Sequence, residues 1–413
     1  MKAVVFTLGC KVNSCESDSL ITGLKERGYE VYDTLTYADL YIVNTCAVTS
    51  EAEKKSRQMV ARINKHNKNA KIIFTGCATE KNPQAFFGKE NVTLVTGSQA
   101  KSKILQLLDE KGVIIEHDNG CFDEMPLPVT LRTRSYVKVQ DGCNNFCSYC
   151  IIPYLRGRIR SRSPQSVIEE INAISGYEII ITGINLSAYN YGGLGLGGLL
   201  DTLVGVKKRI RLGSLEVNVI TDEFLQTTTK LYDFAPHFHL SLQSASDNVL
   251  KSMNRHYTFK EYAEKVALIR KYYPNGAITT DIIAGFPTET EEDFICSLNS
   301  ITEIGFADVH CFPYSPRNGT VAYKMKDLPM PLKKERTERL LQAALKGKLQ
   351  FVKDNLNSIQ TVVFEEFDGE YTAGYTANYV RTYLKGNHSG KLLKVKLTES
   401  YLEGAIAQLY MEE

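Results

Sequence analysis

Residues 141–150 of the chain are Asp141-Gly142-Cys143-Asn144-Asn145-Phe146-Cys147-Ser148-Tyr149-Cys150, with three cysteines in the spacing C-x3-C-x2-C. Because the cysteines fall within eight residues, one short loop can bring all three sulfur atoms to a single inorganic cluster. Cubane [4Fe–4S] clusters are held by cysteine thiolates, and three such ligands leave one iron open to a ligand that is not protein. The spacing therefore predicts a [4Fe–4S] cluster on Cys143, Cys147 and Cys150.

A structural zinc site is the alternative for this loop, and it would require a fourth protein ligand. The candidates are Cys121, which is the nearest in the sequence, and the distant His237 and His239. None of them stands at a spacing that is typical of zinc sites, so we favour the iron–sulfur cluster.

The chain around this loop predicts six strand–helix units, because apolar runs of strand length alternate with stretches of helical periodicity. The predicted strands are Tyr136–Val139, Glu178–Thr182, Ile210–Leu215, Phe238–Leu242, Ile278–Ala284 and Val309–Pro313. The predicted helices are Pro164–Ser175, Leu194–Lys208, Thr221–Thr228, Phe259–Tyr273 and Glu291–Glu303. Six units are typical of a partial (β/α)6 barrel. The cysteine loop would then lie at the carboxyl-terminal face, where the active sites of barrels form.

Polar residues stand at the carboxyl ends of the predicted barrel strands. They are Gly183 and Asn185 after the second strand, Glu216 after the third, Gln243 after the fourth and Asp281 within the fifth. Such groups have a reason to be there if a charged, ribose-bearing cofactor lies across the mouth of the barrel. Any one of them could instead cap a helix or be a satisfied polar group of the core. As a set they favour a bound cofactor.

The first hundred residues predict a smaller unit with an open parallel α/β sheet. Apolar runs at Ala3–Phe6, Leu40–Val43 and Lys71–Phe74 are separated by amphipathic stretches at Ser17–Arg27 and Ser50–His66. A cysteine follows each run, and the three are Cys10, Cys46 and Cys77. Because the carboxyl ends of parallel strands share one edge of the sheet, the three sulfur atoms should converge there. This convergence predicts a second [4Fe–4S] cluster with one open iron.

Cysteines that merely fill an apolar core are the alternative for this second set. Three cysteines at the same place in three successive units favour a shared ligand instead. Cys15 lies inside the predicted first helix, and we interpret it as a bystander.

The last part of the chain predicts a long helix, from about Leu328 to about Phe351, and then a small β-barrel. The short β runs are Gln360–Glu365, Tyr371–Tyr375, Val380–Leu384 and Leu392–Leu397. Small barrels of about five strands commonly bind oligonucleotides. The residues that could stack bases and hold phosphate are Tyr375, Asn378, Tyr379, Arg381 and Lys385. Six Lys and Arg against nine Asp and Glu over residues 351–413 weaken this interpretation.

The composition predicts a cytoplasmic protein. No apolar stretch approaches the roughly 20 residues that span a bilayer, and Met1–Leu8 is too short for a signal peptide. A formal net charge of +2 excludes a general polycation, so binding to nucleic acid would need a local patch. With ten cysteines and no export signal, reduced thiols are expected rather than disulfides.

Four arginines directly follow the cluster loop, and they are Arg156, Arg158, Arg160 and Arg162. Runs of charge are usually solvated surface. Beside a redox site, contact with phosphate or with an anionic substrate is an equally good interpretation.

Taken together, these features resemble the radical S-adenosylmethionine methylthiotransferase family over essentially the whole chain. Gly9-Cys10-Lys11-Val12-Asn13 is similar to the MtaB branch of that family. Further matching stretches are Arg156-Gly157-Arg158, Ser241-Leu242-Gln243-Ser244, Thr280-Asp281-Ile282-Ile283 and Phe312-Pro313-Tyr314-Ser315. The departures from the family pattern are Val217, Ala245, Thr288 and Ser14-Cys15, and none of them removes a cluster ligand.

The resemblance implies an α/β multidomain fold with a TRAM-like barrel at its C-terminus. The expected domains are an N-terminal methylthiotransferase domain at 1–115, a radical S-adenosylmethionine domain at 130–350 and a TRAM-like RNA-binding domain at 351–413. A linker from about Glu110 to Thr130 would join the first two.

Two [4Fe–4S] clusters and S-adenosyl-L-methionine are the cofactors that the resemblance implies. Cys143, Cys147 and Cys150 would hold the cluster that cleaves S-adenosylmethionine to a 5′-deoxyadenosyl radical. Cys10, Cys46 and Cys77 would hold an auxiliary cluster that handles sulfur. The residues expected to contact S-adenosylmethionine are Tyr149, Gly183, Asn185, Glu216, Gln243, Arg255 and Asp281.

The implied reaction is the methylthiolation of N6-threonylcarbamoyladenosine at C2, beside the tRNA anticodon, with an electron donor such as flavodoxin or ferredoxin. Alternatives are isopentenyladenosine in tRNA, a side chain of a ribosomal protein, and a non-enzymatic iron–sulfur protein that binds RNA. The threonylcarbamoyl arm carries a carboxylate, so the site should offer a cation, most naturally a bidentate arginine. The candidates for this cation are Arg156, Arg158, Arg160, Arg162 and Arg255.

Overall fold

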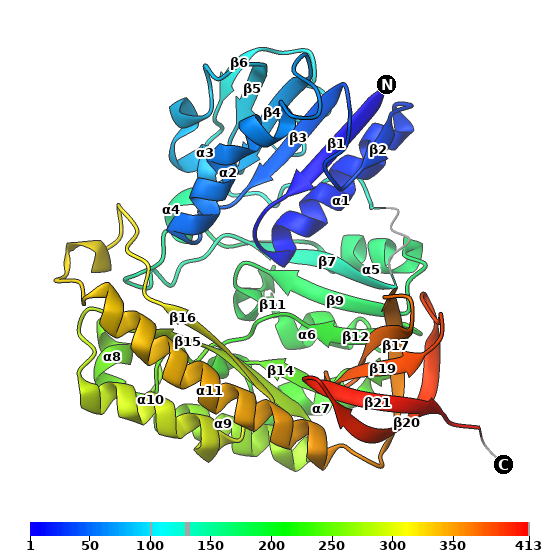
Figure 1. Ribbon diagram of the computed structural model, residues 1–413, viewed down its shortest axis with the longest axis vertical. Coiled ribbons are helices and arrows are strands. Elements are labelled where there is room, and N and C mark those ends of the chain that lie inside the picture. The colour runs from blue at the N-terminus through cyan, green and yellow to red at the C-terminus, as the bar shows by residue number, and fades with distance from the viewer. Residues whose placement is uncertain (100, 129–132, 412–413) are drawn as a thin grey trace.

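The computed structural model of the chain describes residues 1–99, 101–128 and 133–411, which form three parts (Figure 1). The N-terminal sheet lies at one end of the molecule, a curled set of parallel strands forms the middle part, and a small closed barrel lies beside it. This is the fold class that the sequence predicts. The expected boundary at residue 130 and the last two residues lie outside the described residues. Among the described residues, no helix is both long and apolar enough to cross a membrane.

Six parallel strands form the N-terminal sheet, in the order β2-β1-β3-β4-β5-β6. They are β1 (Lys2–Thr7), β2 (Glu30–Tyr32), β3 (Leu40–Thr45), β4 (Lys71–Gly76), β5 (Val92–Thr96) and β6 (Gly112–Ile114). The helices are α1 (Lys11–Glu26), α2 (Ser50–Ile63) and α3 (Cys77–Lys81). The three predicted strands are β1, β3 and β4, and they lie next to one another. Because β6 adds a strand within the predicted linker, that linker is shorter than expected.

The middle part contains six parallel strands, each of which overlaps one of the predicted barrel strands. They are β7 (Arg134–Asp141), β9 (Glu178–Gly183), β12 (Arg209–Leu212), β14 (His237–His239), β15 (Ala277–Ala284) and β16 (Asp308–Pro313). The first sheet has the order β13-β12-β9-β7-β8, with β8 (Arg160–Ser161) and β13 (Asp233–Phe234) as short additions. The second has the order β14-β15-β16, and a parallel bridge between Leu215 and Leu240 links the two.

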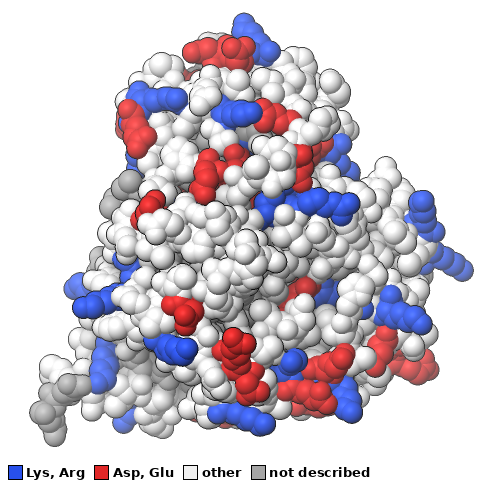
Figure 2. Space-filling model, turned by 180° about the vertical axis from the view of Figure 1, so that it is seen from behind, with Lys and Arg blue, Asp and Glu red and all other residues white. Residues whose placement is uncertain are grey.

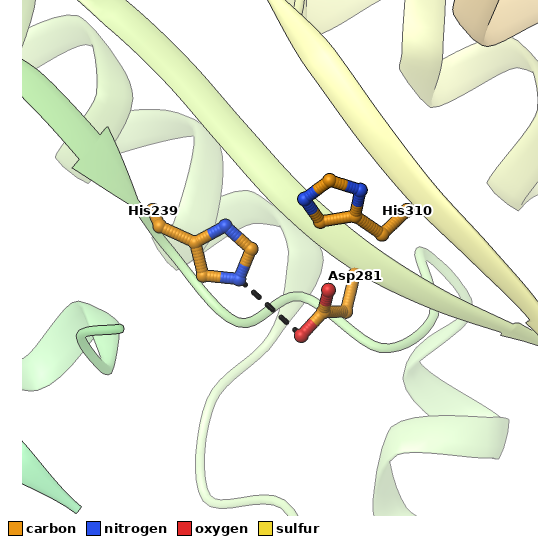
Figure 3. A group of neighbouring side chains, drawn as sticks. All are labelled: His239, Asp281 and His310. Atoms are coloured by element: carbon orange, nitrogen blue, oxygen red, sulfur yellow. Dashed lines mark hydrogen bonds and ion pairs between the residues drawn. The ribbon is translucent and has the colours of Figure 1, made fainter. Parts of the chain in front are cut away.

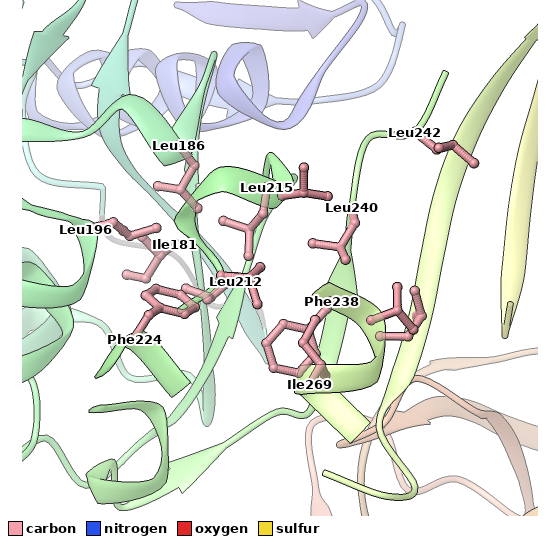
Figure 4. Close-up of a cluster of buried hydrophobic side chains, with 14 of the residues drawn as sticks. Ile181, Leu186, Leu196, Leu212, Leu215, Phe224, Phe238, Leu240, Leu242 and Ile269 are labelled. Carbon is pink, nitrogen blue, oxygen red and sulfur yellow. The ribbon is translucent and has the colours of Figure 1, made fainter. Parts of the chain in front are cut away.

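Helices cover the outer side of the middle part, and their apolar side chains form its core with the strands (Figure 4). Ile181, Leu212 and Phe238 from the strands pack against Phe224 and Ile269 from the helices. Full burial of each such side chain contributes about 1.5–3 kcal/mol. The helices are α4 (Ile152–Arg156), α5 (Pro164–Ala173), α6 (Leu196–Asp201), α7 (Asp222–Lys230), α8 (Asp247–Ser252), α9 (Phe259–Tyr272) and α10 (Glu291–Ile304).

The helix predicted over Leu194–Lys208 is much shorter in the structure. Its first residues form β11 (Leu194–Gly195), which pairs with β10 (Asn190–Tyr191), and α6 covers only six residues. Glycines make the difference, because each glycine inside a helix costs roughly 0.5–1 kcal/mol relative to alanine. The predicted segment contains Gly195, Gly197, Gly198 and Gly205.

Helix α11 (Met330–Asp354) crosses the front of the middle part and leads into the C-terminal barrel (Figure 1). The barrel is closed, in the order β17-β18-β19-β21-β20. Its strands are β17 (Ile359–Phe367), β18 (Tyr371–Thr376), β19 (Arg381–Lys385), β20 (Leu392–Tyr401) and β21 (Gly404–Leu409). On the face of the molecule in Figure 2, positive and negative side chains are interspersed, in agreement with the low net charge.

A buried network of charges joins α1 to the middle part. Glu16 of α1 accepts hydrogen bonds from Arg156 at 2.7 Å, from Lys138 at 2.9 Å and from Lys101. Asp141 of β7 pairs with Lys138 at 2.6 Å and with Arg156 at 3.2 Å. Burial alone would raise the pKa of Glu16, but the three cations hold it well below its ordinary value. Two carboxylates and three cations therefore form one desolvated cluster, which is tolerated only because every charge is paired.

A second set of buried charges holds the C-terminal barrel on the middle part. Glu178 of β9 pairs with Arg211 of β12 through contacts of 2.6 and 3.1 Å. Arg211 also donates to the backbone oxygens of Thr376 and Ala377, at 3.1 and 3.0 Å. Glu178 thus orients the arginine that binds the barrel.

We expect Glu178→Gln to destabilise the protein at neutral pH, because Arg211 would lose a charged partner. Burial alone would raise the pKa of Glu178, but Arg211 and the neighbouring arginines lower it below its ordinary value of 4.5. The stabilisation from an ionised carboxylate with a lowered pKa is present above the ordinary pKa and is lost as the pH falls further. The difference in urea midpoint between wild type and variant should therefore shrink between about pH 7 and about pH 4. A difference that does not change with pH would contradict this role.

Candidate active site

One cavity of about 690 Å³ lies where the three parts of the chain meet, and we call it the central cavity. It is lined by the edge of the N-terminal sheet, by the carboxyl ends of the barrel strands and by Tyr379 of the C-terminal barrel. All six cysteines predicted as ligands and all seven residues predicted to contact S-adenosylmethionine lie on this lining. Its volume is within the roughly 300–1,000 Å³ that is typical of cofactor sites.

The first set of cysteines lies at the carboxyl ends of neighbouring strands. Cys10 is the N-cap of α1, Cys46 directly follows β3 and Cys77 begins α3. Gly9, at a φ of +104°, allows the backbone before Cys10 to approach Cys46 closely, since a Cβ at this position would lie 2.7 Å from the Cβ of Cys46. Arg156 donates from Nε to the Sγ of Cys77 at 3.4 Å. The fold therefore brings these three sulfur atoms to one end of the central cavity.

The second set of cysteines lies on the loop between β7 and α4. Arg255 donates from Nη1 to the Sγ of Cys147 at 3.4 Å, and Asn185 donates from Nδ2 to the Sγ of Cys143 at 3.8 Å. Cys15 is buried and lines a different, smaller cavity, so it does not compete with either set.

The donor atoms fit iron–sulfur clusters. Each set places three sulfur atoms on the lining of one cavity, and each receives at least one N–H hydrogen bond, a contact that tunes cluster sulfur. Burial raises the pKa of Cys46 to about 11 and the pKa of Cys150 to about 12. Because thiolates are the ligands, loading of these sites must release protons, and affinity should rise with pH.

The residues predicted to contact the cofactor are connected to the cysteine loop. The Oε1 atom of Glu216 accepts from Asn145 at 2.5 Å and from Arg255 at 3.1 Å. Gln140 accepts from the backbone N–H of Asn185 at 2.7 Å, which fixes the segment after β9. These contacts hold a carboxylate and an amide beside Cys143 and Cys147.

The arginine run is mostly structural, which corrects the interpretation that it meets an anionic substrate. Arg160 pairs with Asp118 at 2.6 Å, and Arg162 pairs with Glu124 at 2.9 Å and with Glu170. Arg158 contacts the ring of Phe146 at 4.8 Å and does not line the central cavity. Arg156 and Arg255 do line it, but both are paired with carboxylates. The partners of these arginines come from distant parts of the chain, so the run alone could not reveal them.

Three histidines that were not predicted as site residues also line the central cavity. His237 and His239 alternate along β14 and therefore share one face of the strand. Both bind the hydroxyl of Thr279, at 2.9 and 3.0 Å, and His239 also lies 3.3 Å from Asp281. His239, Asp281 and His310 offer ligand atoms within 4.8 Å of one another (Figure 3). The pattern of two histidines two residues apart on a strand was the signal available in the sequence.

The contacts of His239 disfavour it as a zinc ligand for the cysteine loop. Both of its ring nitrogens are engaged, Nδ1 by Thr279 and Nε2 by Asp281, whereas His237 binds Thr279 through Nε2 and its Nδ1 has no partner among the described residues. Cys121, the third candidate, is exposed and does not line the central cavity.

Lys11 is the first residue of α1, and it lines the central cavity beside Cys10. Its side chain is exposed on the cavity wall, and the protein around the cavity removes part of the water from its ammonium. Burial lowers the pKa of Lys11, and the charges of Arg211 and Arg134 lower it further, whereas Asp281 and Cys10 act in the opposite direction. In the sequence, Lys11 was singled out only as part of Gly9-Cys10-Lys11-Val12-Asn13, the stretch that resembles the MtaB branch of the family.

The aromatic face of the C-terminal barrel is turned towards the middle part. The ring of Tyr379 stacks on His237 with centroids 4.2 Å apart, and Tyr375 stacks on Tyr379 at 4.6 Å. Arg134 and Arg211 lie over the same two tyrosines, at 4.8 and 5.1 Å. The prediction that these tyrosines stack RNA bases is therefore wrong, because their faces are occupied by the protein.

Two protein-family models match the chain. Residues 2–97 match the model described as "Uncharacterized protein family UPF0004", and residues 137–300 match the "Radical SAM superfamily". Among solved structures, the radical S-adenosylmethionine methyltransferase TsrM from Kitasatospora setae has a TM-score of 0.54 at 13% identity. That match covers 76% of this chain and 73% of TsrM, and it shows that the two proteins share a fold.

Curated relatives match the chain almost from end to end. The threonylcarbamoyladenosine tRNA methylthiotransferase MtaB of Bacillus subtilis is 38% identical over 100% of this chain and 98% of its own length. MtaB of Thermotoga maritima is 37% identical over 98% of this chain and 97% of its own length. The tRNA-2-methylthio-N(6)-dimethylallyladenosine synthase of Endomicrobium trichonymphae is 31% identical over 89% of each chain. Since identity at this level extends across the N-terminal sheet, the barrel and beyond, the chain belongs to the radical S-adenosylmethionine methylthiotransferase family.

Proposed function

We propose that this enzyme adds a methylthio group to C2 of N6-threonylcarbamoyladenosine, beside the anticodon of a tRNA. The observation that carries the proposal is the central cavity, because both sets of cysteines open into it. Four relatives named for threonylcarbamoyladenosine are 36–38% identical and a fifth is 30% identical, whereas relatives named for dimethylallyladenosine are 31–33% identical. This order favours the threonylcarbamoyl substrate.

In this proposal each set of cysteines holds one [4Fe–4S] cluster. When bound, the clusters and S-adenosylmethionine supply radical and sulfur chemistry at a C–H bond that no general acid or base could activate. The six ligands are Cys143, Cys147 and Cys150 on the loop and Cys10, Cys46 and Cys77 on the N-terminal sheet. Because one cavity serves both sets, a bound adenine can meet both without leaving the protein.

The other residues of the cavity would orient the cluster sulfur atoms, bind S-adenosylmethionine and shield both from water. Arg255 and Asn185 direct N–H groups at the loop sulfurs, and Arg156 does the same for Cys77. Glu216, held by Arg255, offers a carboxylate to the amino or hydroxyl groups of S-adenosylmethionine. The remaining proposed contacts are Tyr149, Gly183, Gln243 and Asp281. With a tRNA bound across the mouth, the walls of the cavity would limit the access of bulk water to a reactive intermediate.

The substrate and the electron donor come from outside the chain. The anticodon stem–loop of a tRNA would bind across the mouth of the cavity, and a protein such as flavodoxin or ferredoxin would supply electrons. Arg381 and Lys385, at the two ends of β19, are the proposed phosphate contacts of the TRAM-like barrel, since Tyr375 and Tyr379 are engaged elsewhere.

A competition among three tRNAs tests the substrate. One tRNA carries threonylcarbamoyladenosine, one carries isopentenyladenosine and one is unmodified. We expect methylthio product from the first at a rate at least about tenfold above the others, because a site built for a polar arm rejects an analogue that lacks it. Mass spectrometry of the digested nucleosides gives the readout. Equal turnover of the first two, or preference for the second, would overturn the substrate and leave the methylthiotransferase activity intact.

A further inference from the structure

Lys11 has no partner for its charge among the residues that the structure describes. On the part of the cavity lining that the structure describes there are three lysine or arginine side chains, and they are Lys11, Arg156 and Arg255. Arg156 pairs with Glu16 at 2.7 Å, and Arg255 pairs with Glu216 at 3.1 Å. Within the described part of the chain, the ammonium of Lys11 has neither a hydrogen bond nor an ion pair. Of the Lys and Arg side chains on the described lining, Lys11 is thus the one without a pairing partner.

Each carboxylate of the described lining has another partner, and none makes a hydrogen bond or an ion pair with Lys11. Glu216 is held by Arg255, and Asp281 lies 3.3 Å from His239. Asp308 pairs with Lys348 at 3.0 Å. These three carboxylates are held towards other cations or rings, so the Lys11 ammonium can accept an anion that enters from outside.

The backbone around Lys11 also suits an anion. Lys11 is the first residue of α1, a helix of 16 residues whose N-cap, Cys10, makes no capping hydrogen bond through its side chain. The first turn of α1 contains no acidic residue. A helix N-terminus carries a partial positive charge, which adds to that of the ammonium.

We propose that the ammonium of Lys11 binds the carboxylate of the threonylcarbamoyl arm of the substrate. This assignment rests on the proposed function and replaces the five arginines that the sequence suggested for the role. A lysine provides a point charge with three rotatable donors, so it can follow a flexible arm as well as hold it. Backbone phosphates of a tRNA would remain at the mouth of the cavity, whereas the modified base has to enter it. The entering arm is thus the anion that can reach Lys11.

The assignment explains how the site would refuse an isopentenyl arm. A wholly apolar arm would cover the ammonium without pairing with it, and the cost of an unpaired buried charge works against that substrate. Discrimination would then come from the first residue of α1, and the radical-generating loop would be the same for either substrate.

The test measures binding, so that it does not depend on turnover. Anaerobically reconstituted protein is titrated with two anticodon stem–loop oligonucleotides, one with threonylcarbamoyladenosine and one with its methyl ester, which lacks the negative charge. We expect wild type to bind the acid tighter than the ester by on the order of ten- to a hundredfold, the range typical of a charged hydrogen bond. Lys11→Met and Lys11→Gln should both lose this preference, and Lys11→Arg should keep part of it.

Lys25→Met is the matched control, because Lys25 lies in the last turn of the same helix and is exposed. It should keep the preference of wild type for the acid. Iron content and cluster absorbance are measured for every variant. If Lys11→Met and Lys11→Gln lose iron, Lys11 serves the neighbouring cluster and the assignment is wrong.

The remaining outcomes separate the two proposals. If wild type methylthiolates the threonylcarbamoyl stem–loop and Lys11→Met still prefers the acid, the proposed function stands and the role of Lys11 is overturned. If wild type forms no methylthio product from that stem–loop, the proposed function itself fails. Loss of the preference in both Lys11 variants, with full iron and an unchanged Lys25 control, supports the assignment.

Discussion

Replacing Cys143, Cys147 and Cys150 together with alanine is expected to abolish the release of 5′-deoxyadenosine from S-adenosylmethionine. The same change should lower the iron content of reconstituted protein from about eight atoms per chain to about four, because one of two cubanes is lost. The physical reason is the separation of the two sets of cysteines, one on the loop after β7 and the other on the N-terminal sheet. Each set can therefore be emptied without removing a ligand of the other.

The complementary variant replaces Cys10, Cys46 and Cys77. It should also retain about four iron atoms, and it should still release 5′-deoxyadenosine but form no methylthiolated product. Cys296→Ala is a suitable control, because that cysteine is exposed and does not line the central cavity. Iron analysis and chromatography of the reaction give both readouts. If only one of the two triple variants lost iron, the assignment of two clusters would be wrong.

Glu16→Gln is expected to destabilise the protein by about 3–5 kcal/mol, the usual cost of removing one partner from a buried charge pair. Glu16 accepts from Arg156, Lys138 and Lys101, and the substitution leaves these cations with Asp141 as the remaining carboxylate of the network. Because the network lies between α1 and β7, the loss should appear as earlier unfolding of the N-terminal sheet.

Chemical denaturation followed by limited proteolysis measures this effect. Glu26→Gln is the matched control, since Glu26 lies on the same helix and is exposed, and it should change the stability by less than about 0.5 kcal/mol. If Glu16→Gln also changed the stability by less than about 0.5 kcal/mol, the remaining charged groups would have rearranged around the amide. The network would then not be required to join α1 to the middle part.

The strands and the cysteines could be predicted from the sequence because their signals are local. An apolar run of six residues or a C-x3-C-x2-C loop carries its meaning within a few positions, and β1, β3 and β4 lie where those runs place them. The convergence of Cys10, Cys46 and Cys77 followed from the geometry of parallel sheets, which places the carboxyl ends of strands along one edge.

The roles of the charged and aromatic residues could not be predicted, because each depends on a partner far away in the chain. From the sequence, Arg156 could have bound a substrate. In the structure it donates to Glu16, which lies 140 positions earlier in the chain. Tyr379 looked exposed on its barrel, yet it stacks on His237 of the middle part. Lys11 differs in the opposite way, since among the described residues its ammonium has no hydrogen bond and no ion pair, and a sequence cannot show that such a partner is missing.

The position of the central cavity, between three parts of the chain, limits which nucleotides the enzyme could reach. A base inside an RNA helix is paired and stacked, whereas a base that enters a cavity must be flipped out of its stack. Flipping costs a few kcal/mol and least of all for an unpaired base. The secondary structure of the RNA would therefore act as a first filter: the same modified adenosine should react in a hairpin loop and be refused in a duplex, before any contact with its side arm is made.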